Sequence, residues 1–520
     1  MRKSLAFNCI IHAIGIFLAL LTYQAIPYII RITVLKKQQS YIMKIPKTGR
    51  SRKEILEHLK SYKKQDITWQ SGRAYGYIYD PGEEILEFAK EVYCLFLCEN
   101  ALDFTAYPSL LKIENDLVSM IRKHLQGDDQ VAGNFTSGGT ESIFLALKAA
   151  RDYFRKEKPD VKEPEMILPS SAHGALHKAA HYLGIKTVTV SVDPNTFKAD
   201  LIKTRENINE NTILMVGSAP TYTQGVVDPI SELSVMAQDH NIWFHTDACM
   251  GGFLLPYFRR LGEPVADFDF SLPGVCSLSV DLHKYAYAPK GASLVFHRSP
   301  KLRSYQIFSF TKWLGYTLVN STVQSTKSGG PLAAAWTVLN YIGDEGYLEF
   351  ARKKLEAVKK IKQAISQIPE LYLMVEPEMT LISFGSKAVN AFHIIDEMNL
   401  KGWYIQPSLS FDGVPANIHL TITLSNVIHT DQFIDDLKES VEKATHLPSG
   451  VLLERLKSIM DKQGAALLDN PGFLFELAGI KEGQMPKRMA PLNEVLDAMP
   501  PEWREKILLH VVNRFFHPES

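Results

Sequence analysis

A histidine and a lysine stand side by side in "SVDLHKYAYAPKG", residues 279–291, just after a short apolar run. The pair is His283 and Lys284, and a second lysine, Lys290, follows in the same stretch. Most His-Lys pairs are ordinary surface pairs in a turn. A lysine that follows a buried strand can also act as a nucleophile toward a carbonyl group, because a desolvated amine loses its proton more easily. The rest of the chain must decide between these two interpretations.

Three further stretches carry polar side chains in comparable places. Asp247 follows an apolar run in "HTDAC", and His173 follows another in "AHGALHKAA". "TSGGTES" opens a helical pattern with Gly138, Gly139 and Thr140, where backbone amides and the helix dipole favour a phosphate. Each signal alone is weak, because Gly-Gly is usually a turn and an aspartate after a strand commonly caps a helix.

Taken together, these residues meet the needs of one cofactor, pyridoxal phosphate. That cofactor needs an anion cradle, an acid that keeps its ring nitrogen protonated, a flat side chain against the ring and a lysine that bonds to its aldehyde. We assign the stacking plane to His173, the acid to Asp247, the amine to Lys284 and the cradle to Gly138, Gly139 and Thr140.

Alternating elements must bring these residues together. From residue 135 onward, helical patterns separate the apolar runs "MILPS", "TVTVSV", "TILMVGS", "IWFHTD", "SLSVD" and "ASLVFH". This rhythm predicts an α/β domain with a largely parallel sheet, in which residues just past the strands meet at one edge. Asp228 and Pro229 are expected to cap and start a helix over residues 230–240.

The chain divides into five expected regions. They are a membrane anchor with a basic flank (1–37), a helical segment (38–134), a large pyridoxal-phosphate-binding α/β domain (135–345), a smaller α+β domain (346–447) and a helical tail without recognisable chemistry (448–520). The helical segment contains the patterns "EILEFAKEVYCLFL" and "SLLKIENDLVSMIRKHL". Cys94 and Cys98 share one helical face in this segment and are expected in the core.

The amino end differs in kind from the rest. Leu5–Ile30 contains no charged residue and is long enough as a helix to cross a bilayer. We interpret it as one membrane span, in preference to a secretory signal, a core helix or an interfacial helix. The basic residues that follow it place the large carboxyl-terminal part in the cytoplasm. Asn134 and Asn320 stand in glycosylation sequons, which can test this orientation.

Composition excludes several other classes. The 57 Lys and Arg residues balance the 57 Asp and Glu residues, so nothing favours a nucleic-acid partner. The 5 cysteines among 520 residues are too few for a disulfide scaffold. They also lack the paired spacing of a zinc site, so we expect no metal.

Three of these motifs resemble those of a known family. "TSGGTES", "HTDACMGGF" and "SVDLHKYAYAPKG" are similar to the motifs of the sphingosine-1-phosphate lyases, within the pyridoxal-phosphate decarboxylase-like enzymes. The resemblance implies the type I fold, which is that of aspartate aminotransferase. It also implies that Lys284 bonds to the cofactor, His283 touches the cofactor phosphate and Asp247 meets the pyridine nitrogen.

The same resemblance implies contacts with a substrate phosphate. It assigns them to Lys290 and to a tyrosine before the helical pattern "ILEFAKEVY", which corresponds to Tyr79, although Tyr75 and Tyr77 lie close enough to compete. The implied reaction cleaves the C2–C3 bond of a phosphorylated sphingoid base, giving a fatty aldehyde and phosphoethanolamine. The implied setting is a homodimer with active sites between its subunits, held by a single-pass anchor in the endoplasmic reticulum membrane.

Two residues depart from the family pattern. Asp103 stands where the family has a histidine near the substrate phosphate, and a carboxylate there would repel the phosphate. Lys327 stands where the family has an arginine, which is not a neutral exchange. Two other functions therefore stay open: an amino-acid decarboxylase that uses the same cofactor, and a cofactor-binding relative with impaired turnover.

Overall fold

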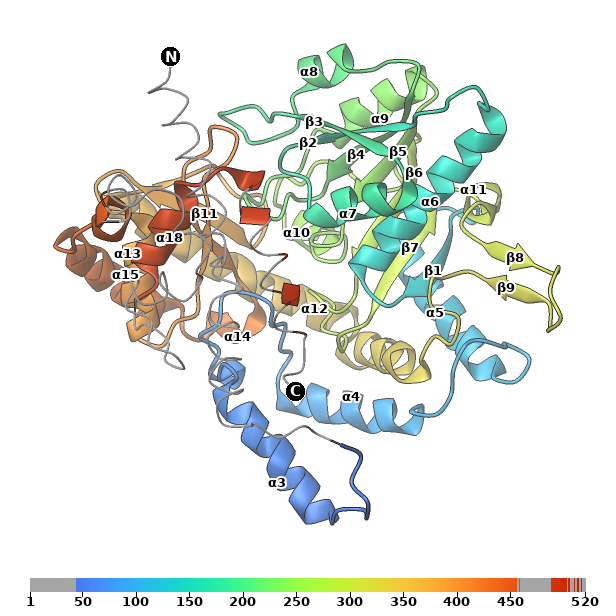
Figure 1. Ribbon diagram of the computed structural model, residues 1–520, viewed down its shortest axis with the longest axis horizontal. Helices are drawn as coiled ribbons and strands as arrows, with labels where there is room; N and C mark the ends of the chain where they lie inside the picture. The colour runs from blue at the N-terminus through green and yellow to red at the C-terminus, as the bar shows by residue number, and fades with distance from the viewer. Residues whose placement is uncertain are drawn as a thin grey trace.

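The computed structural model describes residues 44–455, 458, 488–502, 504, 505, 509, 512, 513 and 516. The large sheet and its helices form one lobe, and the smaller sheet with its helices forms a second lobe beside it (Figure 1). The membrane span expected at Leu5–Ile30, and much of the tail expected beyond residue 448, lie outside the described residues. Within the described part of the chain, no helix combines the length and apolarity needed to cross a bilayer.

Seven strands form the large sheet in the order β1-β7-β6-β5-β4-β2-β3. Their bounds are Ala132–Thr136 (β1), Glu165–Pro169 (β2), Lys186–Val190 (β3), Thr212–Ser218 (β4), Trp243–Asp247 (β5), Val275–Asp281 (β6) and Ser293–His297 (β7). Strands β3, β2, β4, β5 and β6 run parallel, whereas β7 pairs antiparallel with both β6 and β1. The mostly parallel sheet is confirmed, and all six expected runs form strands. Strand β1 was not expected as a strand, and it begins before residue 135.

Helices connect these strands and cover the sheet (Figure 1). They are α6 (Gly139–Glu157), α7 (Gly174–Leu183), α8 (Leu201–Glu206), α9 (Ile230–Asp239), α10 (Leu255–Arg260) and α11 (Pro300–Ser304). Helix α6 buries the apolar stripe Ile143, Leu147, Ala150 and Phe154.

Helix α9 begins where the sequence predicts, but its capping residue was predicted wrongly. No side chain caps α9, and the Asp228 carboxylate instead accepts hydrogen bonds from the amides of Ala199 and Ser218, each at 2.8 Å. Asp228 is fully buried, and burial raises its pKa to about 6. Its carboxylate therefore joins β4 to the segment before α8 rather than starting a helix.

A four-stranded antiparallel sheet organises the smaller lobe, in the order β10-β11-β13-β12. The strands are β10 (Leu371–Leu373), β11 (Leu381–Ser386), β12 (Gln406–Ser408) and β13 (Asn417–Thr421). The helices are α12 (Gly329–Gln367), α13 (Ala391–Leu400), α14 (Leu424–Val427), α15 (Thr430–Thr445) and α18 (Ala490–Asp497). Helix α12 spans both lobes and contains one non-helical residue, Gly343, whose φ of 66° suits a glycine.

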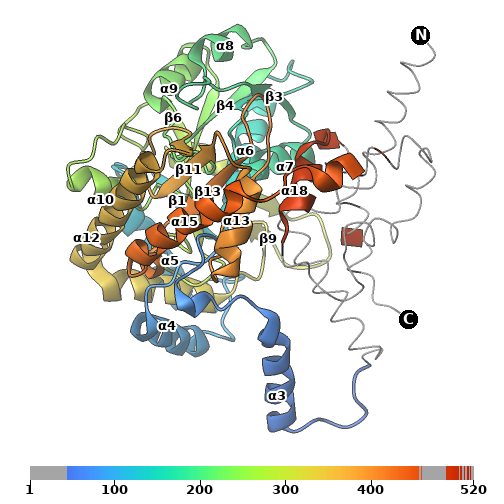
Figure 2. The same cartoon turned by 90° about the vertical axis from the view of Figure 1, so that its left-hand side faces the viewer.

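The amino-terminal segment contains α3 (Arg52–Tyr62), α4 (Glu83–Leu95) and α5 (Pro108–His124). Helix α3 buries no residue and projects from the body (Figure 2). Helices α4 and α5 match the two expected helical patterns. The core position expected for Cys94 and Cys98 is wrong, because both side chains are exposed. Tyr93 packs against α12 at Gly330, so the next residue, Cys94, points away from that contact.

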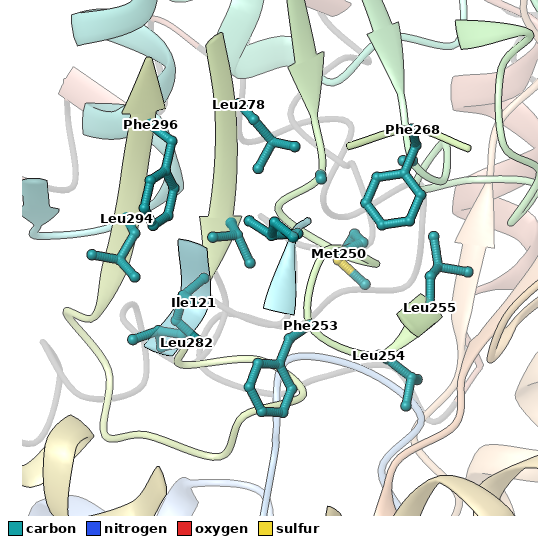
Figure 3. Close-up of a cluster of buried hydrophobic side chains, with 14 of the residues drawn as sticks. Ile121, Met250, Phe253, Leu254, Leu255, Phe268, Leu278, Leu282, Leu294 and Phe296 are labelled. Atoms are coloured by element: carbon teal, nitrogen blue, oxygen red, sulfur yellow. The ribbon is translucent and has the colours of Figure 1, made fainter. Parts of the chain in front are cut away.

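The largest apolar core lies between the large sheet and the helices below it. Leu278 and Leu282 from β6 and its following turn meet Phe296 of β7, Ile121 of α5 and Met250 in this cluster (Figure 3). Met250 belongs to this core and also lines the cavity described below. The closely packed core therefore supports the cavity wall at Met250.

Candidate active site

A cavity of about 390 Å³ opens at the carboxyl ends of β4, β5 and β6. The structure brings seven of the predicted residues to its wall: Gly138, Gly139, Thr140, His173, Asp247, His283 and Lys284. They come from segments that follow β1, β2, β5 and β6, as expected for a ligand site of a parallel sheet. Tyr79, Asp103 and Lys290 do not line this cavity.

The start of α6 forms an anion cradle. Gly138 has a φ of 151°, and no side chain caps the helix there. A Cβ placed on Gly138 would meet nothing nearer than His283 Cε1 at 3.7 Å, so the space above it is open. A Cβ on Gly139 would lie 2.7 Å from Asp281 Oδ1 and 2.9 Å from Cys249 Sγ. The backbone conformation of Gly138 suits glycine, and only glycine fits the close packing at Gly139, so the backbone of both residues lines the cavity.

Asp247 ends β5 and is 6% exposed. Its Oδ1 accepts hydrogen bonds from the Cys249 amide at 3.1 Å and from Ser279 Oγ at 3.2 Å. Its Oδ2 accepts no hydrogen bond from any described residue, and the side chain lines the cavity. One oxygen therefore fixes the carboxylate and the other is available to a ligand.

Lys284 follows β6 and forms an ion pair with Asp281, whose Oδ2 lies 3.0 Å from its Nζ. Burial lowers the pKa of Lys284, but Asp281, Cys249 and Asp247 together raise it above its ordinary value. Burial likewise raises the pKa of Asp281, and Lys284 and His283 outweigh that effect and hold it below its ordinary value. The second oxygen of Asp281 is buried without a hydrogen-bond partner in the described chain. The ion pair with Asp281 thus favours the charged form of Lys284.

His283 and Lys290 lie on the same loop as Lys284. The Ala292 amide donates to His283 Nδ1 at 3.3 Å, which places the His283 ring proton on Nε2, 3.6 Å from Asp281. Lys290 Nζ donates to the His283 carbonyl at 3.4 Å. Burial and the charge of Lys284 lower the pKa of Lys290 to about 8. One short loop therefore carries two basic side chains, Lys284 and Lys290.

His173 caps α7, and its Nδ1 accepts a hydrogen bond from the Ala175 amide at 3.1 Å. This bond holds the ring at the cavity wall, in contact with Tyr222 at a centroid distance of 6.3 Å. Tyr222 donates to Gln406 Oε1 at 2.8 Å, so the wall continues into the smaller lobe. The flat ring of His173 is in place to stack on a planar ligand.

Tyr79 is the one of the three candidate tyrosines that lies beside Lys290. The Lys290 amine is 4.9 Å from the centroid of the Tyr79 ring, and this ring packs edge-on against Tyr285 at 5.1 Å. Tyr75 is buried against Trp403, and Tyr77 is 43% exposed. The structure thus favours Tyr79 for the predicted contact with a substrate phosphate.

Asp103 lies on an exposed turn, where its Oδ1 accepts hydrogen bonds from the amide and hydroxyl of Thr105 at 2.8 and 2.6 Å. These bonds with Thr105 lower the pKa of Asp103. Lys327 is buried, and its amine donates to Glu114 Oε2 at 2.6 Å and to the Phe135 carbonyl at 3.1 Å. Both departures from the family pattern therefore have local partners away from the cavity wall of this chain.

Sequence reasoning missed the other residues of the wall, among them the titratable side chains Asp281, Tyr222 and Glu141. Glu141 accepts from the Ser137 amide at 2.6 Å and from the Val323 amide at 2.8 Å, which ties the loop after residue 320 to the cradle. Asp281 had a signal, because it stands three residues before Lys284 in the quoted motif. Tyr222 had none, since its segment is an ordinary loop in sequence.

The donor set fits pyridoxal phosphate. The uncapped start of α6 suits the phosphate, and the unbonded oxygen of Asp247 suits a protonated ring nitrogen. Lys284 supplies the amine, and the His173 ring supplies the flat contact. The fold and this set of groups define the class: a pyridoxal-phosphate-dependent enzyme of the decarboxylase type.

Comparison with known proteins supports the class and narrows it. The family model "Pyridoxal-dependent decarboxylase conserved domain" matches residues 37–387, and a model for the C-terminal HTH domain of pyridoxal-dependent enzymes matches residues 455–514. A sphingosine-1-phosphate lyase of Arabidopsis thaliana is 39% identical over 80% of this chain and 76% of its own length. A solved sphingosine-1-phosphate lyase of Burkholderia pseudomallei is 34% identical, with a TM-score of 0.75, over 82% of this chain and 98% of its own.

The chain therefore belongs to the sphingosine-1-phosphate lyase family, as the sequence motifs predict. A relative from Pyrococcus furiosus with another name, "Probable L-aspartate decarboxylase", is 34% identical over 70% of this chain and 95% of its own length. The decarboxylase family model and this relative therefore do not by themselves separate a lyase from a decarboxylase.

Proposed function

We propose that this protein cleaves the C2–C3 bond of a phosphorylated sphingoid base, releasing a fatty aldehyde and phosphoethanolamine. The observation that carries the proposal is that Lys290 lies on the loop of Lys284 with Tyr79 beside it, where a second cation can bind a substrate phosphate. Relatives named sphingosine-1-phosphate lyase support it at 39% and 34% identity. No arginine lies on the cavity wall formed by the described residues, which disfavours a substrate held by its carboxylate.

The predicted residues on the cavity wall have distinct roles in this mechanism. Asp247 would keep the proton on the ring nitrogen, His173 would lie against the ring, and the backbone at Gly138 and Gly139 would hold the cofactor phosphate. Bound pyridoxal phosphate supplies the electron sink for the electron pair left on C2 when the C2–C3 bond breaks. The 3-hydroxyl loses a proton as the aldehyde forms, and C2 gains one before phosphoethanolamine leaves. Lys284 would supply the amine that holds the cofactor.

The decisive experiment offers the purified protein two kinds of substrate. One is a phosphorylated sphingoid base, and the other is a panel of L-amino acids that includes aspartate. We expect long-chain aldehyde from the first and no carbon dioxide from the second. Carbon dioxide from an amino acid would establish the decarboxylase, which the Pyrococcus relative favours. Absence of both products from protein that binds the cofactor would establish the impaired relative.

We also propose a homodimer whose active sites lie between the subunits. The hairpin of β8 (Phe308–Phe310) and β9 (Leu318–Asn320) projects from the large lobe (Figure 1) and exposes large apolar side chains. These are Phe308, Phe310, Trp313, Leu314 and Tyr316. The loop after this hairpin is bound to the cradle through Glu141, so a second copy on the hairpin would lie near the cavity. Leu314→Asp should give monomers in sedimentation velocity, and an unchanged dimer would contradict this placement.

We further propose that the protein is anchored in the endoplasmic reticulum membrane by Leu5–Ile30, with its body in the cytoplasm. The uncharged span and the basic residues after it support this orientation. Deletion of residues 1–37 should release the protein from membranes during fractionation. Of the two sequons, Asn320 is the useful probe, because the Asn134 side chain is buried and donates to Glu114 Oε1 at 3.1 Å. A glycan on Asn320 would show a lumenal body.

A further inference from the structure

A lysine buried beneath the active-site loop has no part in the mechanism above. Lys354 is 1% exposed, although it interrupts the otherwise apolar face of α12 formed by Tyr347, Ala351, Val358 and Ile361. No carboxylate pairs with it among the described residues, and burial lowers its pKa to about 7. A buried amine without a counter-charge is energetically costly, so the presence of a lysine here calls for a physical reason.

The contacts of Lys354 are with the loop that carries the active-site lysines. Its amine donates to the hydroxyl of Tyr287 at 3.0 Å and lies 5.0 and 5.1 Å from the ring centroids of Tyr285 and Tyr287. Two turns earlier on α12, the Tyr347 hydroxyl donates to the Ala286 carbonyl at 2.8 Å. Helix α12 therefore binds three consecutive residues of the segment between Lys284 and Lys290.

This segment needs to be held in place. Tyr287 has a φ of 60°, a left-handed conformation that a bulky residue adopts only when its surroundings impose it. Its amide donates to the Lys284 carbonyl at 3.0 Å, so the conformation of Tyr287 sets the path of the chain out of Lys284. The ring of Tyr285 in turn supports Tyr79, over which Lys290 lies.

We propose that Lys354 is a positioning residue of this site, which acts through Tyr287 and Tyr285 to fix the loop that presents Lys284 to the cofactor and Lys290 to the substrate phosphate. The cofactor half of this inference rests on the class of the enzyme, and the phosphate half rests on the proposed function. A variant that frees the loop should loosen both ends of it, whereas a lysine that merely fills the core would affect only stability.

The test compares Lys354→Met, Tyr287→Phe and the double variant with Lys353→Met, which removes an exposed lysine next to it on α12. The rate of cofactor loss from each holoenzyme is followed by absorbance after transfer to cofactor-free buffer. Unfolding by denaturant is measured in parallel, and phosphoethanolamine is used as an inhibitor to probe the phosphate end. Each single variant should lose cofactor about tenfold faster, the effect of one buried hydrogen bond, and Lys353→Met should match wild type.

The double variant separates positioning from stability. It removes both polar partners, so its stability should return toward that of wild type even if Lys354→Met alone folds poorly. We expect its cofactor loss to stay fast and its inhibition by phosphoethanolamine to stay weak, because the loop has lost its bond to Lys354 and keeps only the Tyr347 bond to α12. Recovery of cofactor retention together with stability would overturn the proposal. Failure of the wild type to release aldehyde would refute the reaction alone, since cofactor retention would still report on Lys354.

Discussion

Asp281 Oδ2 lies 3.0 Å from the amine of Lys284, across the turn that follows β6. The two groups are three residues apart in the chain, and both line the cavity. Asp281 is 3% exposed and His283 also approaches it, so one carboxylate organises both members of the His-Lys pair. The ordinary surface pair that the sequence alone allows is thereby excluded.

Asp281→Asn should destabilise the cofactor-free protein by about 3 kcal/mol at pH 7, because it leaves the Lys284 ammonium without its counter-charge in a buried place. The folded pKa of Asp281 lies below its ordinary value, so its contribution is present above about pH 4 and is lost as the pH falls further. The difference in denaturant unfolding between wild type and variant should therefore shrink from pH 7 to pH 3. Glu349→Gln, at an exposed ion pair, should cost under about 0.5 kcal/mol and serves as the control.

Lys284→Ala should abolish covalent attachment of the cofactor, because no other amine on the described cavity wall can replace it. Treatment with borohydride followed by mass spectrometry should label the wild type and leave the variant unlabelled. Lys290→Ala should still be labelled at Lys284, which controls for general loss of positive charge on the loop. A label on the Lys284→Ala protein would refute the central assignment.

Glu114→Gln and Lys327→Met should each lower the free energy of unfolding by about 3 kcal/mol, because either change leaves one member of a buried ion pair without its partner. The double variant should cost far less than the sum of the two, because it leaves no buried charge unpaired. Unfolding by denaturant measures all three. Lys112→Met removes an exposed ion pair with Asp116 on the same helix and should change stability by under about 0.5 kcal/mol. Additive losses would show that Lys327 does not act through Glu114.

The kcat/KM for a phosphorylated sphingoid base should fall as the pH rises through about 8, because Lys290 then loses the charge that attracts the substrate phosphate. Lys290→Met should lower kcat/KM about tenfold at pH 7, mainly through KM, and should remove the inflection near pH 8. A variant that keeps both the wild-type value and the inflection would show that Lys290 does not contact the phosphate.

The structure also changes how two sequence departures are understood. From the sequence, Asp103 and Lys327 suggested that phosphate recognition was damaged. In the structure, Asp103 accepts a hydrogen bond from Thr105, and Lys327 donates one to Glu114. The Asp103 contact is local in sequence, whereas the Lys327 contact could not be predicted, because Glu114 and Lys327 are joined only when α5 packs beside the start of α12. The same limit explains Asp228, which looks like a helix cap in sequence and instead bonds to two distant amides.

The sequence by itself determined a mostly parallel sheet from six of its seven strands, and it named the seven predicted residues that line the cavity, of which His283 came only from the family resemblance. It could do so because strand and helix periodicity is local, and because residues just past parallel strands converge at one edge for topological reasons. Only the tertiary structure decided which groups hold those residues: Asp281 on Lys284, Tyr79 beside Lys290, and Lys354 beneath Tyr287. These contacts depend on the side-chain packing of elements far apart in the chain, and no local pattern encodes that packing.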